Sequence, residues 1–418
     1  MEEISVRIKE AKSILTDVVH RTPLNRSFTF SKMTKGDVYL KLENLQKTGS
    51  FKVRGAYYAL WKRVKKEKIR ACVAASSGNH AQGVAYSAQT LGIRSVIVMP
   101  LYTPFYKVQA TKSYGAEVLL YGETYDEAFS KACEIARSLG APLIHPFDDY
   151  DVIAGQGTIG VEIYEDLDNV EVVLVPIGGG GLISGIAVAL KKLRPEIEII
   201  GVQPEGAPAL YHSFKKGRLV YVDNIYTIAD GVAVKRPGER TFRIINELVS
   251  DIVLVDDYEI ARAMFLLLER GKLVAEPAGV LPIAALLSGK VDIRGRKVVA
   301  VISGGNVDMS LLSRIVERGL YLEGRVARIA GLLNDRPGEL KKVIDVIAEY
   351  KFNIVSIEHE RANPLIHPGA AKVTLGIEVP DTRSVIKMLD KLKEKGLDFK
   401  LTMGEENGER GYLYREGP

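Results

Sequence analysis

The segment VVLVPIGGGGLISGIAVALKKL, residues 172–193, joins a short apolar run to a longer amphipathic run through four consecutive glycines. This order is typical of a β-strand that leads into an α-helix. It recurs between residues 38 and 306, for example where ACVAAS precedes GNHAQGVAYSAQTLG within residues 71–92. Nearly all of the strand residues are apolar, as expected when helices cover both faces of a mostly parallel sheet. The sequence therefore predicts an α/β fold with open, mostly parallel sheets.

A second pattern begins near Arg325. Strand-like and helical runs follow in the order strand, helix, strand, strand, helix, strand up to residue 402, which is the order of a ferredoxin-like unit. The last residues, 403–418, are polar and contain glycine, so we expect a loosely held tail.

Composition narrows the classes of partner and compartment. The chain has 57 Lys and Arg against 52 Asp and Glu, spread along its length, so a nucleic-acid partner is not expected. Its two cysteines, Cys72 and Cys133, form no CxxC pair and no disulfide framework, which suits a reducing cytosol. No run of 18 apolar residues and no signal-peptide pattern occur, so we expect no membrane span, no secretion and a cytoplasmic location.

Three glycine-containing turns are candidate parts of a ligand site: SSGNHAQG (76–83), GGGG (178–181) and SGGN (303–306). Each follows a strand, and open α/β sheets bind ligands at the carboxyl ends of their strands. Free N–H groups at a helix N-terminus attract anions, and glycine lets the main chain approach a phosphate closely. The four consecutive glycines therefore predict a phosphate cradle.

The usual nucleotide and metal patterns are missing. A GxGxxG match to the glycine run would end on Ile183 or Ser184, and no Walker A lysine occurs, which argues against nicotinamide dinucleotides and nucleoside triphosphates. The six histidines show no HExxH spacing and no cysteine pair has zinc spacing, so no metal site is predicted. GxSxG is also absent, which argues against a serine hydrolase.

Lys52 is the candidate nucleophile. It lies in QKTGSFKVRGA, residues 46–56, between Phe51 and Val53. Apolar neighbours can strip water from the amine and favour the neutral form that gives a Schiff base with an aldehyde. A lysine with apolar neighbours is more often a surface residue whose amine reaches water, so this pattern alone leaves both interpretations open.

The order of these pieces resembles one enzyme family. LENLQKTGSFKVRGA (42–56), then SSGNHAQG, VPIGGGGLISG and ISGGN are similar to the fold type II, tryptophan-synthase-β-like, pyridoxal-phosphate enzymes over residues 5–320. Within that group the chain most resembles the serine/threonine dehydratase family. NHAQGVA, together with the C-terminal unit, resembles the threonine dehydratase (threonine ammonia-lyase) branch of this family.

The resemblance implies a division of the chain. Residues 1–320 would be the pyridoxal-phosphate-dependent catalytic domain, with a smaller subdomain at residues 50–150 inserted in the larger one. Residues 325–402 would be an ACT regulatory domain, since NDRPGEL (334–340) fits its first loop. ACT domains usually pair and bind amino acids, which implies a homodimer or homotetramer and an effector such as isoleucine or valine. A dimerisation module without a ligand remains the alternative.

The resemblance also implies roles for single residues. Lys52 would hold pyridoxal 5'-phosphate covalently, and Ser303 would donate to the nitrogen of its ring. The full set of implied cofactor contacts is Phe51, Lys52, Asn79, Gly178, Gly179, Gly180, Gly181, Leu182 and Ser303. The loop implied to receive the substrate carboxylate consists of Ser76, Ser77, Gly78 and His80. For His80, a structural role at the start of a helix is an equal alternative.

The implied reaction is the β-elimination of water from L-threonine, which yields 2-oxobutanoate and ammonia, with L-serine as a second substrate that yields pyruvate. Lys52 would take the Cα proton as general base. Ser77 stands where many threonine dehydratases carry alanine and serine racemases carry a catalytic serine, so serine racemase and serine dehydratase remain alternatives. In EGAPALY (205–211), Tyr211 stands where the family's metal stretch has a carboxylate, so no metal is assigned.

A third alternative comes from another functional class. A non-catalytic amino-acid sensor with this fold would have lost cofactor residues, whereas all of those named above are present. The resemblance fits both isoleucine biosynthesis and threonine breakdown, because the same chemistry serves both.

Overall fold

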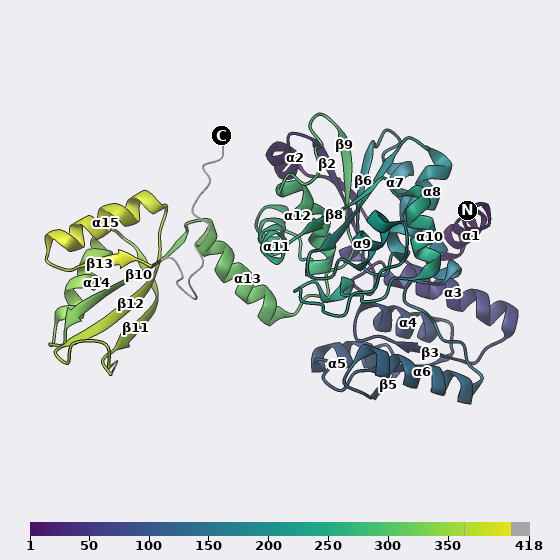
Figure 1. Ribbon diagram of the computed structural model, residues 1–418, viewed down its shortest axis with the longest axis horizontal. Helices are drawn as coiled ribbons and strands as arrows, with labels where there is room; N and C mark the ends of the chain where they lie inside the picture. The colour runs from purple at the N-terminus through teal and green to yellow at the C-terminus, as the bar shows by residue number, and fades with distance from the viewer. Residues whose placement is uncertain (363, 403–418) are drawn as a thin grey trace. The chain divides into compact units, whose positions relative to one another are not determined.

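The computed structural model of the chain describes residues 1–362 and 364–402, so the predicted tail lies outside the described residues. The chain forms two compact units, Met1–Leu311 and a second one that begins at Leu312, inside helix α13 (Met309–Leu322). Figure 1 shows the strands and helices of both units.

The first unit contains two sheets. The larger has the strand order β1-β2-β9-β6-β7-β8, and all of its neighbouring pairs are parallel except β1 with β2. Its strands are β1 (Leu24–Arg26), β2 (Asp37–Leu42), β6 (Val172–Pro176), β7 (Glu198–Pro204), β8 (Asp251–Val255) and β9 (Lys297–Ile302). The smaller sheet is parallel, in the order β3 (Ala71–Ala75), β4 (Arg94–Met99), β5 (Glu117–Leu120). The predicted α/β fold with mostly parallel sheets is therefore confirmed.

One or two helices follow most of these strands along the chain. They are α1 (Glu2–Leu15), α2 (Phe28–Thr34), α3 (Lys52–Glu67), α4 (Asn79–Thr90), α5 (Phe105–Ser113), α6 (Tyr125–Leu139), α7 (Tyr150–Asp166), α8 (Gly181–Leu193), α9 (Ala209–Lys216), α10 (Glu239–Leu248), α11 (Asp257–Gly271) and α12 (Leu281–Leu287). Short 3-10 turns are η1 (Glu43–Leu45), η2 (Asp230–Val232) and η3 (Pro277–Val280). Among the described residues, no helix is both long and apolar enough to cross a membrane.

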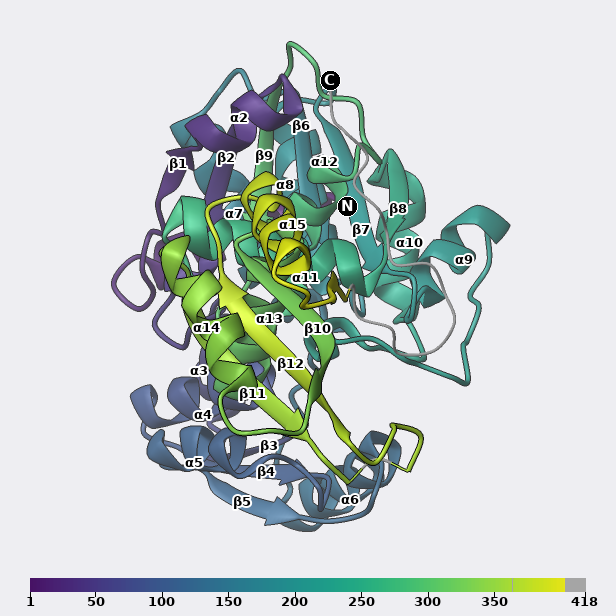
Figure 2. The ribbon, with the colours of Figure 1, turned by 90° about the vertical axis from the view of Figure 1, so that its left-hand side faces the viewer.

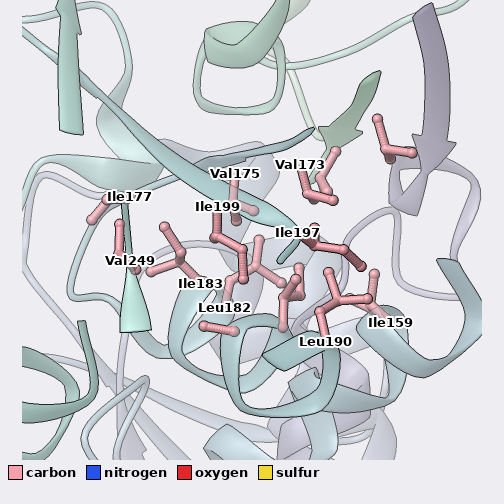
Figure 3. Packing of buried hydrophobic residues seen from close by; sticks show 14 of the residues in the cluster. Ile159, Val173, Val175, Ile177, Leu182, Ile183, Leu190, Ile197, Ile199 and Val249 are labelled. Atoms are coloured by element: carbon pink, nitrogen blue, oxygen red, sulfur yellow. The ribbon is translucent and has the colours of Figure 1, made fainter. Parts of the chain in front are cut away.

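The main core lies between the larger sheet and α8 (Figure 3). Val173 and Val175 of β6 point the same way because strand side chains alternate between faces. They pack with Ile199 of β7 against Ile183 and Leu190 of α8, and all five side chains are fully buried. Full burial of such a side chain contributes about 1.5–3 kcal/mol, so this layer holds the strand ends and the start of α8 in fixed positions.

Helix α7 was not among the elements predicted from the sequence. Its segment YDVIAGQGTIGVEIYED contains three glycines, which have low helix propensity. Close packing explains them. A Cβ on Gly155 would lie 2.6 Å from the carbonyl oxygen of Arg54 on α3, and one on Gly157 would lie 2.8 Å from that of Gly185 on α8. Tertiary contact therefore overrides local propensity here.

The second unit has the predicted strand and helix order. It consists of β10 (Val326–Asn334), α14 (Glu339–Glu349), β11 (Asn353–Glu360), β12 (Ala370–Glu378), α15 (Thr382–Glu394) and β13 (Phe399–Leu401). The strands form an antiparallel sheet in the order β11-β12-β10-β13. Val346 of α14 and Met388 of α15 are buried against Leu375 of β12, so both helices pack on this sheet (Figure 2).

Candidate active site

Two of the glycine-containing turns lie against the start of α3. The backbone N–H of Phe51 donates to the carbonyl oxygen of Ser303, at 3.1 Å, in the turn after β9. The turn after β3 leads into α4, and Gly83 lies in the second turn of that helix. A Cβ on Gly83 would lie 3.1 Å from the backbone of Lys52. Lys52 therefore begins its helix between these two strand ends.

The amine of Lys52 is held by a backbone carbonyl and is largely shielded from water. Its Nζ donates to the carbonyl oxygen of Pro146 at 2.9 Å. Part of the side chain reaches solvent, but loss of water around the amine lowers the pKa of Lys52 to about 8, while the negative charge of Glu276 acts in the opposite direction. At pH 7 roughly a tenth of such amines are neutral, against fewer than about one in a thousand at the ordinary lysine pKa. The amine is therefore suited to nucleophilic and base chemistry.

A buried cluster of ion pairs fixes α3 close to Lys52. Arg54 donates through Nε to Glu43, at 2.9 Å, and through Nη1 to Glu162, at 2.6 Å. Lys41 donates to the second oxygen of Glu162 at 2.6 Å. The four groups come from β2, η1, α3 and α7, and their charges balance. Because the cluster lies inside the protein, it holds these elements in one register.

Asn79 is oriented by two polar neighbours. Its Nδ2 donates to Oε1 of Glu276 at 2.7 Å, and its Oδ1 accepts from Nδ2 of Asn306 at 2.7 Å. Burial, together with the negative charge of Asp230, raises the pKa of Glu276 to about 7. Asn306 was predicted only as part of the candidate turn SGGN (303–306), and Glu276 was not predicted as a site residue. The only signal for Glu276 was a single carboxylate within the apolar stretch LVAEPAGV, residues 273–280.

The glycine run forms a tight loop before α8. A Cβ on Gly179 would overlap the ring of Phe147, and Gly180 has φ +94°, which only glycine adopts easily. The carbonyl of Gly179 accepts from the hydroxyl of Thr241 at 2.7 Å, so that carbonyl already has a partner. The first N–H groups of α8 lack both intrahelical acceptors and a side-chain cap. Such an N-terminus suits a phosphate group.

Three further predicted residues lie around this loop and the start of α3. Leu182 is 4% exposed and packs in the main core (Figure 3), so only its main chain can face a ligand. Ser303 is also buried and lies directly after the last residue of β9. The ring of Phe51 lies beside the amine of Lys52, with 5.2 Å between Nζ and the ring centroid.

The loop before α4 presents main-chain donors. Its Ser76 hydroxyl accepts from the N–H of Gly78 at 3.2 Å, and no side chain caps the helix. In the described part of the chain the hydroxyl of Ser77 makes no hydrogen bond. His80 is buried, and its Nε2 lies 2.9 Å from the carbonyl oxygen of Ile144. Burial and the charge of Lys52 lower the pKa of His80 to about 3, so its ring is neutral and donates to that carbonyl.

These residues fit pyridoxal phosphate. An aldehyde needs an amine that is partly neutral at physiological pH, and Lys52 provides one. A phosphate needs free N–H groups, and the start of α8 provides them. Across residues 1–362 and 364–402, no three His, Cys, Asp or Glu side chains group so that they could hold a metal ion.

Comparison with known proteins agrees with this fit. Residues 15–304 match the family model described as pyridoxal-phosphate dependent enzyme. An L-threonine ammonia-lyase of Thermotoga maritima is 48% identical over 394 residues, which cover 94% of this chain and 98% of that protein. A solved structure of threonine deaminase isoform 2 from Solanum lycopersicum matches with a TM-score of 0.72 and 38% identity, over 76% of this chain and 88% of that one. Maize serine racemase matches with a TM-score of 0.71 and 34% identity, over 76% of this chain and 97% of that one.

The structural matches confirm the predicted fold type II architecture of the first unit. They also agree with pyridoxal phosphate as the cofactor. On the match of its residues 15–304, the chain belongs to the family of pyridoxal-phosphate dependent enzymes.

Proposed function

We propose that this chain is an L-threonine ammonia-lyase, which releases water and then, by hydrolysis, ammonia, so that L-threonine becomes 2-oxobutanoate. L-Serine would be converted to pyruvate by the same steps. The observation that carries this proposal is the 48% identity to the Thermotoga maritima L-threonine ammonia-lyase over nearly the whole length of both proteins. The geometry around Lys52 supports it, because elimination requires a base at the substrate Cα.

The cofactor contacts follow from the positions of the residues. Pyridoxal phosphate, when bound, supplies an aldehyde for amines and a ring that accepts the electron pair of a broken Cα–H bond. Lys52 would hold the aldehyde carbon, and the N–H groups of Gly178–Gly181 and Leu182 would hold the phosphate. Asn79 would donate its remaining Nδ2 hydrogen to the ring hydroxyl, because Glu276 already takes the other one.

Lys52 also acts as the base. Its lowered pKa leaves neutral amine at physiological pH, which can take the Cα proton of threonine. Phe51 and Ser303 would flank the ring and its nitrogen. A serine hydroxyl is neutral, so it stabilises positive charge on that nitrogen less than a carboxylate would.

The substrate carboxylate would lie at the start of α4. The N–H group of His80 and the hydroxyls of Ser76 and Ser77 would be available there, whereas the N–H of Gly78, also implied to bind the carboxylate, would first have to leave the Ser76 hydroxyl. The imidazole of His80 donates to the carbonyl oxygen of Ile144, so the role of His80 would be limited to its main-chain N–H.

Serine racemase is a second candidate function. Ser77 has a hydroxyl without a hydrogen-bond partner in the described residues, and a second acid or base on the opposite face of the substrate would need such a group. Incubation of the enzyme with L-serine, followed by chiral separation of the products, measures this directly. We expect pyruvate to exceed D-serine.

The test of the main proposal is 2-oxobutanoate production from L-threonine by the purified chain with pyridoxal phosphate. Lys52→Ala is expected to lower kcat on the order of 10²–10⁴-fold and to remove the visible absorption band of the bound cofactor. Lys47→Ala is the matched control, because Lys47 is exposed and lies five residues away. Turnover of threonine by Lys52→Ala at the rate of the control would refute the assignment of Lys52.

The second unit would serve as a regulatory ACT domain. Its predicted strand order and its loop NDRPGEL support this role, and pairing of two such units would give a homodimer or homotetramer. Isoleucine and valine are the proposed effectors, which would suit isoleucine biosynthesis in the cytoplasm. Isothermal titration and steady-state assays with each amino acid test this role; no heat and no kinetic effect would reduce the unit to assembly alone.

A further inference from the structure

The segment from His145 to Asp148 joins the lysine to the phosphate loop and has no role in the chemistry above. Its Pro146 carbonyl accepts from the amine of Lys52 at 2.9 Å. Its Phe147 ring fills the space beside Gly179. One short turn therefore contacts both ends of the cofactor site.

Both ends of this segment are anchored. Before it, the N–H of Ile144 donates to the carbonyl oxygen of Val73 on β3, at 2.8 Å. After it, Oδ1 of Asp148 accepts from the N–H groups of Arg240 and Thr241, at 2.9 and 3.1 Å, at the start of α10. Because Ile144 and Asp148 are fixed, the direction of the Pro146 carbonyl depends on the conformation of the turn between them.

His145 shapes that turn. Its Nδ1 accepts from the N–H of Phe147 at 3.3 Å and from the N–H of Asp148 at 2.9 Å. An atom that accepts from N–H groups carries no proton, so the ring is neutral with its hydrogen on Nε2. Asn and Asp side chains make the same bonds to N–H groups two and three residues ahead in Asx turns. The Phe147 ring stands edge-on to the imidazole, with centroids 4.7 Å apart, which fixes its orientation further.

We propose that the Pro146 carbonyl holds the amine of Lys52 whenever that amine is released from the cofactor, and that His145 is the positioning residue that aims this carbonyl. The inference rests on the proposed function, in which one lysine both holds the cofactor and takes the substrate proton. A neutral amine has two N–H donors and one lone pair. When one N–H is donated to a fixed carbonyl, the flexible side chain adopts one position and the lone pair stays free for the proton.

The test compares two variants of the full-length chain, His145→Leu and His145→Asn. Leucine cannot accept a hydrogen bond, whereas asparagine restores the acceptor through an Asx turn. We expect His145→Leu to lower kcat for threonine on the order of ten- to a hundredfold with little change in KM, because the base is misplaced rather than the substrate. His145→Asn is expected to remain close to wild type.

A second readout does not depend on turnover. Reductive methylation of the cofactor-free chain at a series of pH values, with peptide mass spectrometry, gives the pH profile of the Lys52 amine. A carbonyl acceptor stabilises the ammonium form more than the neutral amine. The methylation profile of Lys52 should therefore shift to lower pH in His145→Leu and should match the wild-type profile in His145→Asn.

Wild-type values of kcat and of the methylation profile in His145→Leu would overturn the proposal. Equal impairment of His145→Asn and His145→Leu would overturn it too, as would failure of His145→Asn to fold. Should the leucine variant not fold, His145→Gln replaces it, since its longer amide misplaces the acceptor. If the wild-type chain makes no 2-oxobutanoate while the methylation profile shifts and returns as stated, the proposed enzyme activity fails and the role of the carbonyl stands.

Discussion

Glu276 is a buried acid that accepts a hydrogen bond from Asn79, and its titration makes stability depend on pH. The pKa of Glu276 is about 7 in the folded chain against the ordinary value of 4.5, so the folded state binds this proton more tightly. This stabilisation is complete below pH 4.5 and is lost as the pH rises through 7. In the neutral variant Glu276→Gln, which keeps the acceptor for Asn79, the loss should disappear. Above pH 7 the variant should be more stable by up to about 3 kcal/mol.

Urea unfolding of the cofactor-free protein between pH 4 and 8 measures this difference. Glu205→Gln is the control, because Glu205 is exposed. A constant difference between Glu276→Gln and wild type across this range would contradict the raised pKa.

At the scale of residues, the sequence indicated those site residues that belong to recognisable stretches. Lys52 and the glycine run stand in such stretches, and the structure brings both to one place. Glu276 and His145 do not, because a single carboxylate or imidazole has no spacing partner in the sequence. Glu276 contacts Asn79, about 200 positions away, and His145 contacts the N–H groups two and three positions ahead of it. Only the fold shows that both residues reach the same site.

At the scale of elements, the loop before α8 should not tolerate a side chain. In Gly179→Ala the new Cβ would overlap the ring of Phe147, so the loop or the ring must move. We expect weaker binding of pyridoxal phosphate, by roughly tenfold or more, and a loss of about 1–3 kcal/mol in stability. Fluorescence titration with the cofactor measures the first effect.

Gly369→Ala serves as the matched control for that substitution. Its Cβ would lie 3.4 Å from the ring of His367, in ordinary contact, and it belongs to the second unit. Unchanged cofactor affinity in Gly179→Ala would contradict the tight packing of the loop.

The ion-pair cluster under α3 should be needed for folding rather than for chemistry. In Arg54→Met two buried carboxylates, Glu43 and Glu162, lose their main partner. We expect a loss of about 3–5 kcal/mol in the free energy of unfolding. Arg21→Met removes two ion pairs, with Glu165 and Asp166, but the arginine side chain is 51% exposed, so the loss should be no more than about 1 kcal/mol. Equal losses in the two variants, by urea unfolding, would show that burial does not matter here.

Elements differ in how far the sequence predicts them. Strands β3, β6 and β9 are apolar runs closed by glycine turns, so local pattern and final structure agree. Helix α7 has weak helix propensity, and it forms because its glycines allow close packing on neighbours that are distant in sequence. A tertiary cause of this kind leaves little trace in the local pattern.

At the scale of the whole molecule, two compact units should unfold as two cooperative steps. Calorimetry of the full-length chain is expected to resolve two transitions, because each unit has its own core. Pyridoxal phosphate should raise the transition temperature of the first unit only. At a concentration one hundred times Kd, it should increase the free energy of unfolding of that unit by about 2.7 kcal/mol. An effector bound by the second unit should raise the other transition temperature. A single transition that shifts with both ligands would contradict independent units.

The close approach of α7 to two helices has a mechanical consequence. The helix that carries Lys52 and the helix that begins at the glycine run both touch the main chain of α7, at Gly155 and Gly157, without a side chain between them. Backbone has no rotamers to change, so the distance between the start of α3 and the loop before α8 is fixed. Bound pyridoxal phosphate would therefore have the same position in every turnover. Any motion that closes the site around the substrate must occur outside α3, α7 and α8.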